Sequence, residues 1–418
     1  MDINNNASGL NMFTRGGKAV SDLSRFTALC EMLGNPHYGL KFVHIAGTNG
    51  KGSVSEYISR AMVSQGYKTG KFTSPYIYNI RERIQIRDKL ISQKDFDENV
   101  STTVNAARKT KTPTEFSQFE ILTAAAFLHF SKKKTDIVVL ETGIGGLLDC
   151  TNVIIPEISV ITAIDFDHSE ILGSQLHEIA AHKAGIIKEG VGRPAPPCVM
   201  YPVQERAAYI EIKKRAEKTG AELIVPDTDM VSGEKVSVYG NSFCYNGEEF
   251  ETVMGGRHQV LNALTAIETL KALGIETAHI QAGLKAAQIP ARMQIVRKNP
   301  MVVLDGAHNR QGVAAVKELF GTWRVRKAVV FGMLNGKDYI GAIKELLEFA
   351  HYLVFTDGFA ENAVSCSDLY RVAALFGFER ENIFTVSRPR KALELAEELC
   401  GGGIVLVMGS MRLAEGIK

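Results

Sequence analysis

Apolar runs alternate with segments of helical periodicity along most of this chain. Largely apolar runs, with few polar residues in them, occur at 42–46, 136–141 and 158–164, and each leads into polar or glycine residues. Between them, apolar residues recur near helical spacing, as in 21–33 and 117–131. Because buried parallel strands are continuously apolar and are joined by helices, the pattern predicts an α/β domain with a mainly parallel sheet.

The same pattern places further elements in this first domain. We predict strands at 68–73 and 199–201, helices at 54–64, 93–109, 176–187 and 205–218, and an ordered loop at 74–84. From 230 to 256 the chain changes to short alternating runs separated by Gly240-Asn241 and Asn246-Gly247, which are hairpin signals. We therefore expect a small antiparallel element near 230–256, followed by helices at 258–273 and up to about 287.

A second α/β rhythm follows a segment at 290–300 that begins and ends with proline. Strands are predicted at 301–304, 328–331, 352–356, 383–386 and 404–407, with helices at 312–320, 340–349, 367–376 and 391–399. No Gly-x-Gly-x-x-Gly loop follows the first of these strands, so a dinucleotide site is not predicted there. The expected organisation is a P-loop-type domain at 1–292 and a Rossmann-like C-terminal domain at 293–418.

Composition excludes several classes of protein. The chain has 418 residues, enough for two or three domains, and its net charge of +2 is not the basic footprint of a nucleic-acid-binding protein. No apolar run is long enough to span a bilayer, and the polar segment 1–17 lacks the apolar core of a secretory signal. The six cysteines lie far apart without paired metal spacing, which favours reduced thiols in a cytoplasm.

A glycine-rich turn after the run at 42–46 predicts a phosphate site. The turn reads Gly47, Thr48, Asn49, Gly50, Lys51, Gly52 and Ser53. Glycines let backbone N–H groups approach phosphates, Lys51 can reach an outer phosphate, and Ser53 can bind Mg²⁺. The match to the general P-loop is incomplete, because Gly52 separates the lysine from the hydroxyl. A turn without a ligand is the alternative, and the presence of both polar groups counts against it.

Polar groups also follow other predicted strands. Glu141 ends the run at 136–141, Ser74 follows 68–73, and His168 follows 158–164. Ligands gather at the carboxyl ends of parallel strands, and Mg²⁺ prefers oxygen ligands shared with phosphate. Each residue has an alternative role by itself: Glu141 could cap a helix or pair with an arginine, and His168 could be an ordinary hydrogen-bonded histidine. Their co-occurrence at strand ends favours a site for ATP and Mg²⁺.

Seven motifs occur in order along the chain. They are Gly47 to Ser53, Ser74-Pro75 with Glu82-Arg83-Ile84, Glu141 to Asn152, Asp167-His168, Ala180 to Ile186, His258 to Ala263, and Asp305 to Asn309. In these motifs and their order the chain resembles the folylpolyglutamate synthase/dihydrofolate synthase family of the Mur ligase superfamily. The likeness covers nearly the whole chain and implies a Mur ligase central domain followed by a Rossmann-like ligase domain.

The resemblance implies roles for individual residues. Lys51 and the amides of 47–53 would bind the ATP phosphates. The Mg²⁺ ligands would be Ser74, Glu141 and His168, with Ser53 near the nucleotide-bound metal. Lys183 matches a lysine that is carbamylated in the family, and a plain helix lysine is the alternative. The residues that would complete the ATP site across the domain interface, and so imply domain closure, are Asn262, Arg292, Asp305 and His308.

The implied reaction is ATP-dependent ligation of L-glutamate to a carboxylate of dihydropteroate or a reduced folate. The γ-phosphoryl group of ATP would pass to the acceptor carboxylate, and the α-amine of glutamate would displace phosphate from the acyl phosphate. Lys51, His168 and Lys183 would be the catalytic residues, supported by Mg²⁺. The expected partners are small molecules, with no nucleic acid and no membrane. Family members are commonly monomers, and a cytoplasmic location is expected from the cysteine pattern.

The chain departs from the family pattern at several positions. These are Tyr76 in place of His, Leu147 in place of Arg, Ala291 and Gln294 in place of Gly and Glu, and Arg310 in place of Pro. The departures leave the ATP motifs intact and bear on the fit of the acceptor. Asp149 matches a position that can contact the pterin, and a turn-stabilising aspartate is the alternative.

Two other functions fit the sequence less well. A Mur-type ligase acting on a different carboxylate usually carries an additional N-terminal domain, for which the start of the phosphate loop near Lys41 leaves no room. A catalytically silent nucleotide-binding module would be expected to lose Lys51, Glu141 or His168, and the chain retains all three. ATP hydrolysis that depends on an acceptor carboxylate would separate an enzyme from such a module.

Overall fold

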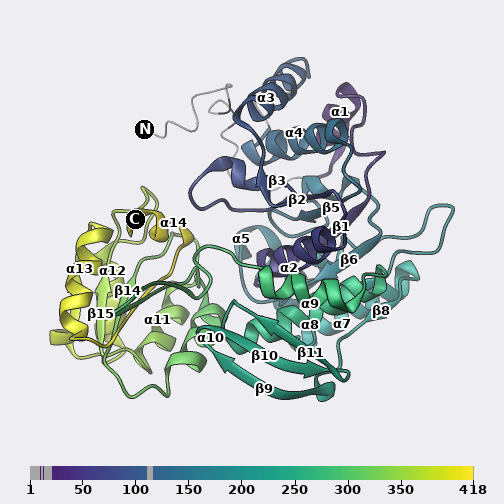
Figure 1. Cartoon of the computed structure of the whole chain (residues 1–418). Coiled ribbons are helices and arrows are strands. Elements are labelled where there is room, and N and C mark those ends of the chain that lie inside the picture. The colour runs from purple at the N-terminus through teal and green to yellow at the C-terminus, as the bar shows by residue number, and fades with distance from the viewer. Residues whose placement is uncertain (1–9, 11–12, 14–20, 111–115, 418) are drawn as a thin grey trace. The chain divides into compact units, whose positions relative to one another are not determined.

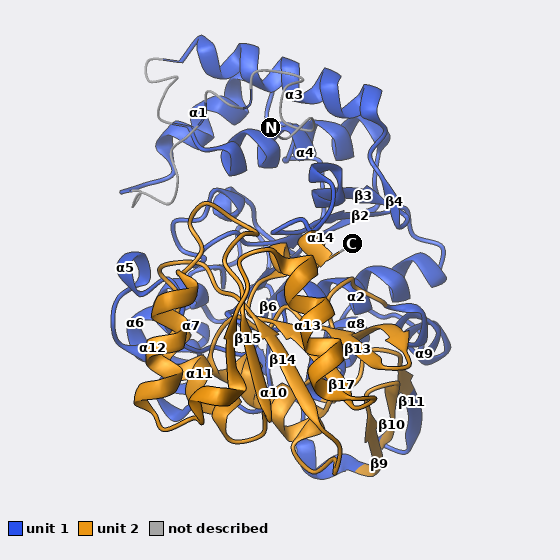
Figure 2. Cartoon of the chain, turned by 90° about the vertical axis from the view of Figure 1, so that its left-hand side faces the viewer, with its two compact units in different colours: residues 1–231, 245–250, 261–287 blue, residues 232–244, 251–260, 288–418 orange. Residues whose placement is uncertain are grey.

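The computed structural model describes residues 10, 13, 21–110 and 116–417. Most of the polar segment 1–17 therefore lies outside the described residues. The chain divides into two compact units (Figure 2). Unit 1 takes the residues up to 231, together with 245–250 and 261–287, and unit 2 takes 232–244, 251–260 and 288–418. The predicted division at 292/293 stays a prediction, and each unit is described by itself.

Unit 1 is built on a sheet with the strand order β4-β3-β2-β5-β1-β6-β7-β8 (Figure 1). The strands are β1 (Phe42–Ala46), β2 (Thr69–Phe72), β3 (Ile84–Ile86), β4 (Lys89–Leu90), β5 (Ile137–Glu141), β6 (Ile158–Ile161), β7 (Cys198–Met200) and β8 (Leu223–Ile224). From β2 to β8 every neighbouring pair is parallel, whereas β3 and β4 add antiparallel to the edge. The predicted mainly parallel sheet is confirmed, with the fully buried β1 near its centre.

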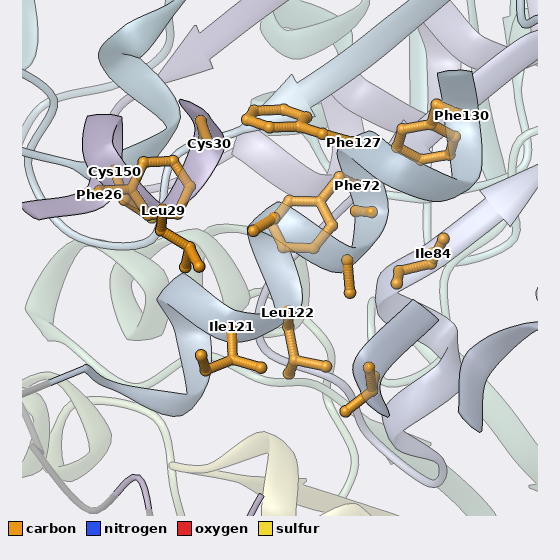
Figure 3. Packing of buried hydrophobic residues seen from close by; sticks show 14 of the residues in the cluster. Phe26, Leu29, Cys30, Phe72, Ile84, Ile121, Leu122, Phe127, Phe130 and Cys150 are labelled. Atoms are coloured by element: carbon orange, nitrogen blue, oxygen red, sulfur yellow. The ribbon is translucent and has the colours of Figure 1, made fainter. Parts of the chain in front are cut away.

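Helices cover this sheet. They are α1 (Ser24–Met32), α2 (Lys51–Ser64), α3 (Gln93–Arg108), α4 (Gln118–Lys133), α5 (Ser169–Leu172), α6 (Leu176–Ala184), α7 (Arg206–Thr219), α8 (Arg257–Ala272) and α9 (Thr277–Ala286). Helices α1, α3 and α4 pack together. Phe127 of α4 lies against Phe26 of α1 with the ring centroids 6.4 Å apart (Figure 3). Its ring centroid also lies 5.7 Å from that of Phe42 in β1. This aromatic core holds β1 in place from one side.

The segment 74–84 is only partly the ordered loop that the sequence predicts. It ends in a 3-10 helix at Ile80–Arg83, and the chain then forms the hairpin of β3 and β4. Arg87 and Asp88 make the turn of this hairpin with φ values of 48° and 62°. Aspartate adopts the left-handed conformation more readily than most residues, but arginine does not, and no glycine follows Asp88. Because the strands are also short, the pattern carried no hairpin signal here.

The antiparallel element predicted near 230–256 is present. Strands β9 (Val231–Ser237), β10 (Gly240–Tyr245) and β11 (Glu248–Thr252) form a sheet in the order β11-β10-β9. Gly240 at φ 134° and the Asn246-Gly247 pair at φ 52° and 81° sit in the connections that the sequence marked. Val238, between β9 and β10, packs into the core of unit 2 beside Met293 and Val303.

Unit 2 contains the second α/β rhythm. Its sheet has the order β12-β13-β17-β14-β15-β16, with strands β12 (Gln294–Lys298), β13 (Met301–Leu304), β14 (Lys327–Phe331), β15 (Tyr352–Phe355), β16 (Ile383–Thr385) and β17 (Ile404–Met408). The helices are α10 (Arg310–Phe320), α11 (Tyr339–Leu347), α12 (Cys366–Leu375), α13 (Pro389–Cys400) and α14 (Met411–Ile417). Strand β12, antiparallel to β13, lies within the segment 290–300 that was predicted only as a boundary.

No helix in the described part of the chain is long and apolar enough to cross a membrane. The six cysteines all lie among the described residues, and none of them forms a disulfide.

Candidate functional site

The phosphate loop connects β1 to α2 at the carboxyl edge of the unit 1 sheet. Helix α2 begins at Lys51, three residues earlier than the predicted start at 54, so Lys51 and Ser53 lie in its first turn. Gly50 precedes the helix with φ 88°, a left-handed backbone that glycine adopts without strain. A Cβ at Gly47 would lie 1.8 Å from Thr162 Oγ1. The amides of a helix N-terminus and two required glycines make this turn suited to a phosphate group.

Two lysines converge on the carbonyl oxygen of Gly47. Lys51 Nζ donates to it at 3.0 Å, and Lys183 Nζ, from α6, donates at 2.7 Å. Lys51 also donates to Thr48 O at 3.3 Å, while Lys183 is only 3% exposed. The structure therefore brings Lys183 to the phosphate loop, although 132 residues separate it from Lys51 in sequence.

The phosphate loop is fastened to the segment that follows β6. The amides of Thr48 and Asn49 both donate to Ala163 O, at 2.8 and 3.1 Å. The Thr48 hydroxyl donates to Asp165 O and accepts from Asp165 N. Beyond this segment, Gln204 accepts from Ile164 N at 3.0 Å and donates to Thr162 O at 2.9 Å. The hydrogen bonds set the position of the strand end that leads to His168.

Glu141 lies at the carboxyl end of β5, beside β1, the strand that leads into the phosphate loop. In the parallel register of β1 and β5 it pairs with Ile45, and it is 2% exposed. Its Oε2 accepts from the amide of Ser74 at 3.3 Å, and its Oε1 lies 4.0 Å from Lys51 Nζ. Glu141, Ser74 and Lys51 are thus neighbours, as the strand-end pattern predicts.

His168 occupies a left-handed backbone position just before α5, with φ 52°. Its side chain is 35% exposed, and its Nε2 lies 3.6 Å from Asp167 Oδ2. Non-glycine residues adopt this conformation rarely, and functional sites are where it is most often kept. The structure thus places a partly exposed imidazole just beyond the end of β6.

Asp149 is buried rather than open to solvent. Its carboxylate accepts four hydrogen bonds: from the amides of Gly143 and Ile144, both at 2.9 Å, and from the amide and hydroxyl of Thr151, at 3.0 and 2.6 Å. Burial raises the pKa of Asp149, against the lowering effect of these bonds. The four bonds close the loop after Glu141 and match the turn-stabilising alternative; direct contact with a pterin stays a prediction.

Asn262 lies against the phosphate loop within unit 1. It sits on α8, is 3% exposed, and its Oδ1 would be 2.3 Å from a Cβ placed on Gly50. This contact joins two motifs that are more than 200 residues apart in sequence.

In unit 2, the predicted residues gather at the carboxyl end of β13. Asp305 accepts from Met293 N and Ala307 N at 2.9 and 2.8 Å, and His308 Nδ1 lies 2.9 Å from Gly306 O. A Cβ on Gly306 would be 2.7 Å from Arg292 Nη1, so Arg292 borders the same turn. Arg292, Asp305 and His308 thus form one cluster.

The departures from the family pattern have structural counterparts. Leu147 is 43% exposed. The Tyr76 ring lies under the Arg83 guanidinium at 5.5 Å, and the Arg310 side chain pairs with Glu345 at 3.0 Å. Ala291 adopts φ 52°, a conformation in which glycine is less strained, and its amide donates to Gln294 at 3.0 Å. None of these side chains replaces an ATP-motif residue.

The residues around Glu141 fit Mg²⁺ only when it is shared with a nucleotide. Across the described residues, no group of three or more His, Cys, Asp or Glu side chains could hold a metal ion. Ser74, Glu141 and His168 contribute one hydroxyl, one carboxylate and one imidazole. Mg²⁺ typically takes one or two carboxylates and fills its octahedron with phosphate oxygens and water. The donor set is consistent with that arrangement.

Sequence reasoning missed two polar residues that organise this edge of the sheet, Gln204 and His44. Gln204 supports the segment after β6, and His44 lies inside β1 with its Nε2 2.9 Å from the hydroxyl of Thr151. A histidine within an otherwise apolar strand run was the available signal for His44. Gln204 gave no signal, because its partners are backbone atoms about 40 residues earlier in the chain.

Comparison with known proteins agrees with this geometry. Residues 45–270 match the family described as the Mur ligase middle domain, and residues 291–411 match the Mur ligase glutamate ligase domain. The chain is 36% identical to the dihydrofolate synthase/folylpolyglutamate synthase of Bacillus subtilis (strain 168), covering 95% of this chain and 94% of that protein. It is 33% identical to the folylpolyglutamate synthase of Lacticaseibacillus casei, covering 81% of each.

Solved structures give the same result. The folylpolyglutamate synthase of Mycobacterium tuberculosis, complexed with ADP and AMPPCP, matches with a TM-score of 0.88 and 27% identity over 94% of each chain. That of Thermotoga maritima matches with a TM-score of 0.79 and 31% identity, covering 95% of this chain and 92% of that one.

The fold and the two family matches define this chain as a Mur ligase. Mur ligases of this type use ATP to join an acid to an amino acid. Within that superfamily it belongs to the folylpolyglutamate synthase/dihydrofolate synthase family. The resemblance seen in the sequence motifs is confirmed.

Proposed function

We propose that this enzyme uses ATP to add L-glutamate to a carboxylate of dihydropteroate, of a reduced folate, or of both. The observation that carries the proposal is the convergence of Lys51, Glu141 and Lys183 on one phosphate loop. Near-full-length similarity to relatives with both activities in their names supports the choice of acceptor. A Mur-type ligase for another carboxylate remains the alternative.

The reaction proceeds in two transfers. An oxygen of the acceptor carboxylate attacks the γ-phosphorus of ATP, the bond to ADP breaks, and an acyl phosphate forms. The α-amine of glutamate then attacks the acyl carbon, phosphate leaves, and the amine loses a proton as the amide forms. Lys51 neutralises charge on the transferring phosphoryl group, where positioning and electrostatics supply most of the catalysis.

Glu141, Ser74 and His168 hold Mg²⁺ in this proposal, with Ser53 near the nucleotide-bound ion. When bound, Mg²⁺ would neutralise phosphate charge and draw the phosphate oxygens into a fixed geometry. Asn262 beside Gly50 belongs to the ATP site of unit 1 in this proposal. Arg292, Asp305 and His308, which cluster within unit 2, are proposed as further ATP-binding residues. Asp149 holds the loop after Glu141, which is proposed to meet the acceptor.

Lys183 is proposed to be carbamylated. Its buried amine shares the Gly47 carbonyl with the ammonium of Lys51, an arrangement in which two like charges repel. The ammonium first loses a proton, and the neutral amine then adds to CO₂, forming a carbon–nitrogen bond and releasing a second proton. The cation thereby becomes an anion beside Lys51. A mass increase of the Lys183 peptide, or rescue of Lys183→Ala by a short carboxylic acid, would support carbamylation.

The enzyme is further proposed to act as a cytoplasmic monomer on small molecules. The unpaired state of its cysteines supports a reducing compartment. Size-exclusion chromatography with light scattering tests the oligomeric state.

The deciding experiment is phosphate release from ATP with Mg²⁺ and L-glutamate, with dihydropteroate or tetrahydrofolate added separately and the products identified by mass spectrometry. Turnover with dihydropteroate alone defines a dihydrofolate synthase, with tetrahydrofolate alone a folylpolyglutamate synthase, and with both a bifunctional enzyme. Absence of product with either acceptor would overturn the folate assignment and leave the ligase class intact.

Replacement of Gln204 by Leu is expected to lower kcat/KM by up to roughly thirtyfold, because each of the two lost hydrogen bonds contributes about 1 kcal/mol to the position of the segment after β6. Gln204→Glu keeps the acceptor for Ile164 N and loses the donor to Thr162 O. Its kcat/KM should therefore lie between those of wild type and Gln204→Leu. Steady-state kinetics provide the measurement. Equal activity of all three enzymes would show that this segment is held without Gln204.

A further inference from the structure

A histidine side chain is buried in the middle of the strand that leads to the phosphate loop. His44 lies in β1, and its side chain is completely buried. Its Nε2 lies 2.9 Å from Thr151 Oγ1, while its Nδ1 is buried without a hydrogen-bond partner among the described residues. Burying a polar side chain at this depth costs folding free energy unless its polar atoms are hydrogen-bonded, so the retained histidine calls for an explanation.

The contacts determine which ring nitrogen carries the proton. The hydroxyl of Thr151 donates to Asp149 Oδ1 at 2.6 Å, so its oxygen is left to accept from His44. His44 therefore bears its proton on Nε2, because a proton on Nδ1 would be a buried donor with no acceptor among the described residues. Burial, with a smaller effect of nearby Lys188, lowers the pKa of His44 to about 3, so the ring stays neutral at physiological pH.

The donors form a directed chain that ends at the loop after Glu141. His44 donates to Thr151, Thr151 donates to Asp149, and the same carboxylate receives the amides of Gly143 and Ile144. Hydrogen bonds in such a chain polarise one another. Only one set of donor directions gives every hydrogen-bond donor in the chain an acceptor. The side chains of His44, Thr151 and Asp149 thus link β1 to the backbone of the loop 143–149.

We propose that His44 is a positioning residue that orients the Thr151 hydroxyl and so holds the loop 143–149 in place for the acceptor. The proposal rests on the proposed function, in which this loop meets the carboxylate substrate. The phosphate loop has its own attachments at Ala163 and Asp165, so His44 acts on the acceptor side rather than on ATP.

The test combines four single variants and one double variant. His44→Leu removes the donor, and Thr151→Val removes the hydroxyl at nearly constant volume. Either change should raise the acceptor KM roughly tenfold, with the KM for ATP within about twofold of wild type and kcat lowered less than KM is raised. The double variant should be no worse than either single one, because both break the same chain. His44→Gln, which places an amide donor near the Nε2 position, and Thr151→Ser should retain the wild-type acceptor KM.

Ser159→Ala is the matched control. Ser159 pairs with His44 in the register of β1 and β6, is fully buried, and donates to Ile186 O at 3.0 Å. Its loss should lower the unfolding temperature without raising the acceptor KM. Hydrogen exchange at Gly143 and Ile144 gives a readout that needs no turnover, and it should accelerate in His44→Leu and Thr151→Val but not in Ser159→Ala.

The outcomes separate the inference from the function beneath it. If wild-type protein turns over neither acceptor, the proposed function fails, while the exchange experiment still tests the hydrogen-bond chain. If wild type is active and His44→Leu keeps both its acceptor KM and the slow exchange of Gly143 and Ile144, the positioning role is overturned. Additive losses in the double variant would likewise overturn it, because they would mean that His44 and Thr151 act separately.

Discussion

Lys51→Met is expected to lower the rate of ATP-dependent ligation by roughly a thousandfold, equivalent to about 4 kcal/mol of transition-state stabilisation. The ammonium stands in the first turn of α2, 3.0 Å from Gly47 O and 4.0 Å from Glu141 Oε1, where it can move to a phosphate without a change of backbone. Methionine has a similar volume and no charge, so the loss reports charge stabilisation. Phosphate release at saturating ATP and acceptor measures it.

The control for this prediction is Lys68→Met. The ammonium of Lys68 also donates a hydrogen bond to a backbone carbonyl, that of Lys133. Lys68 precedes β2, however, and so lies at the opposite end of that strand from Ser74. It should keep wild-type turnover. Lys51→Arg should recover only part of the rate, since the broader guanidinium keeps the charge and changes the geometry. Turnover of Lys51→Met within tenfold of wild type would contradict a role in phosphoryl transfer.

Glu56→Gln destabilises the protein by roughly 3–5 kcal/mol, the largest effect on stability that we expect. Glu56 on α2 is 4% exposed and accepts from both Lys71 of β2 and Arg60, the latter at 2.7 Å. Lys71 is 5% exposed, so a neutral glutamine leaves a buried ammonium without its carboxylate. Arg60 has a second partner, Asp88 at 3.1 Å, and is less affected. Chemical denaturation provides the measurement.

The same pair makes stability depend on pH. Burial would raise the pKa of Glu56, but Lys71 and Arg60 outweigh burial and hold the pKa below its ordinary value of 4.5. A carboxyl group with a lowered folded-state pKa stabilises the fold above its unfolded-state pKa. That contribution is lost as the pH falls below about 4.5 and through the folded-state value. Glu56→Gln should therefore remove part of the acid sensitivity of wild type.

Two further variants serve as controls for Glu56→Gln. Glu98→Gln on α3 breaks an exposed ion pair with Lys94, whose atoms are 4.0 Å apart, and should change the free energy of unfolding by less than about 0.5 kcal/mol. Adding Lys71→Met to Glu56→Gln removes the stranded charge and should recover most of the loss. A Glu56→Gln loss no larger than that of Glu98→Gln would show that water reaches the pair and that it contributes little.

The local sequence was enough for most strands and helices of the parallel core. The runs 136–141 and 301–304 became β5 (Ile137–Glu141) and β13 (Met301–Leu304), because a short and largely apolar run is typical of a strand buried on both faces. The phosphate loop was readable for a related reason: its glycines and lysine are adjacent in sequence. Only the start of α2 was misplaced, since Gly52 is a poor helix former that is tolerated in a first turn.

The edges of both sheets required the tertiary structure. These edges are the hairpin of β3 and β4 in unit 1 and strand β12 at the edge of the unit 2 sheet. The segments are short, carry charged residues and show only a weak hydrophobic pattern. They are strands because a neighbouring strand supplies their hydrogen bonds. Pairing between strands, rather than local propensity, decides such elements.

The sequence by itself determined the family, the α/β class and the identity of the polar residues at the strand ends, because each of these depends on residues close together in the chain. Only the tertiary structure decided that Lys183 reaches the carbonyl of Gly47 and that Asp149 is closed off by four hydrogen bonds. It also decided that a histidine inside β1 is linked to the loop after β5. These contacts join residues that are distant in sequence, and they exist because parallel strands bring their carboxyl ends to one edge of the sheet.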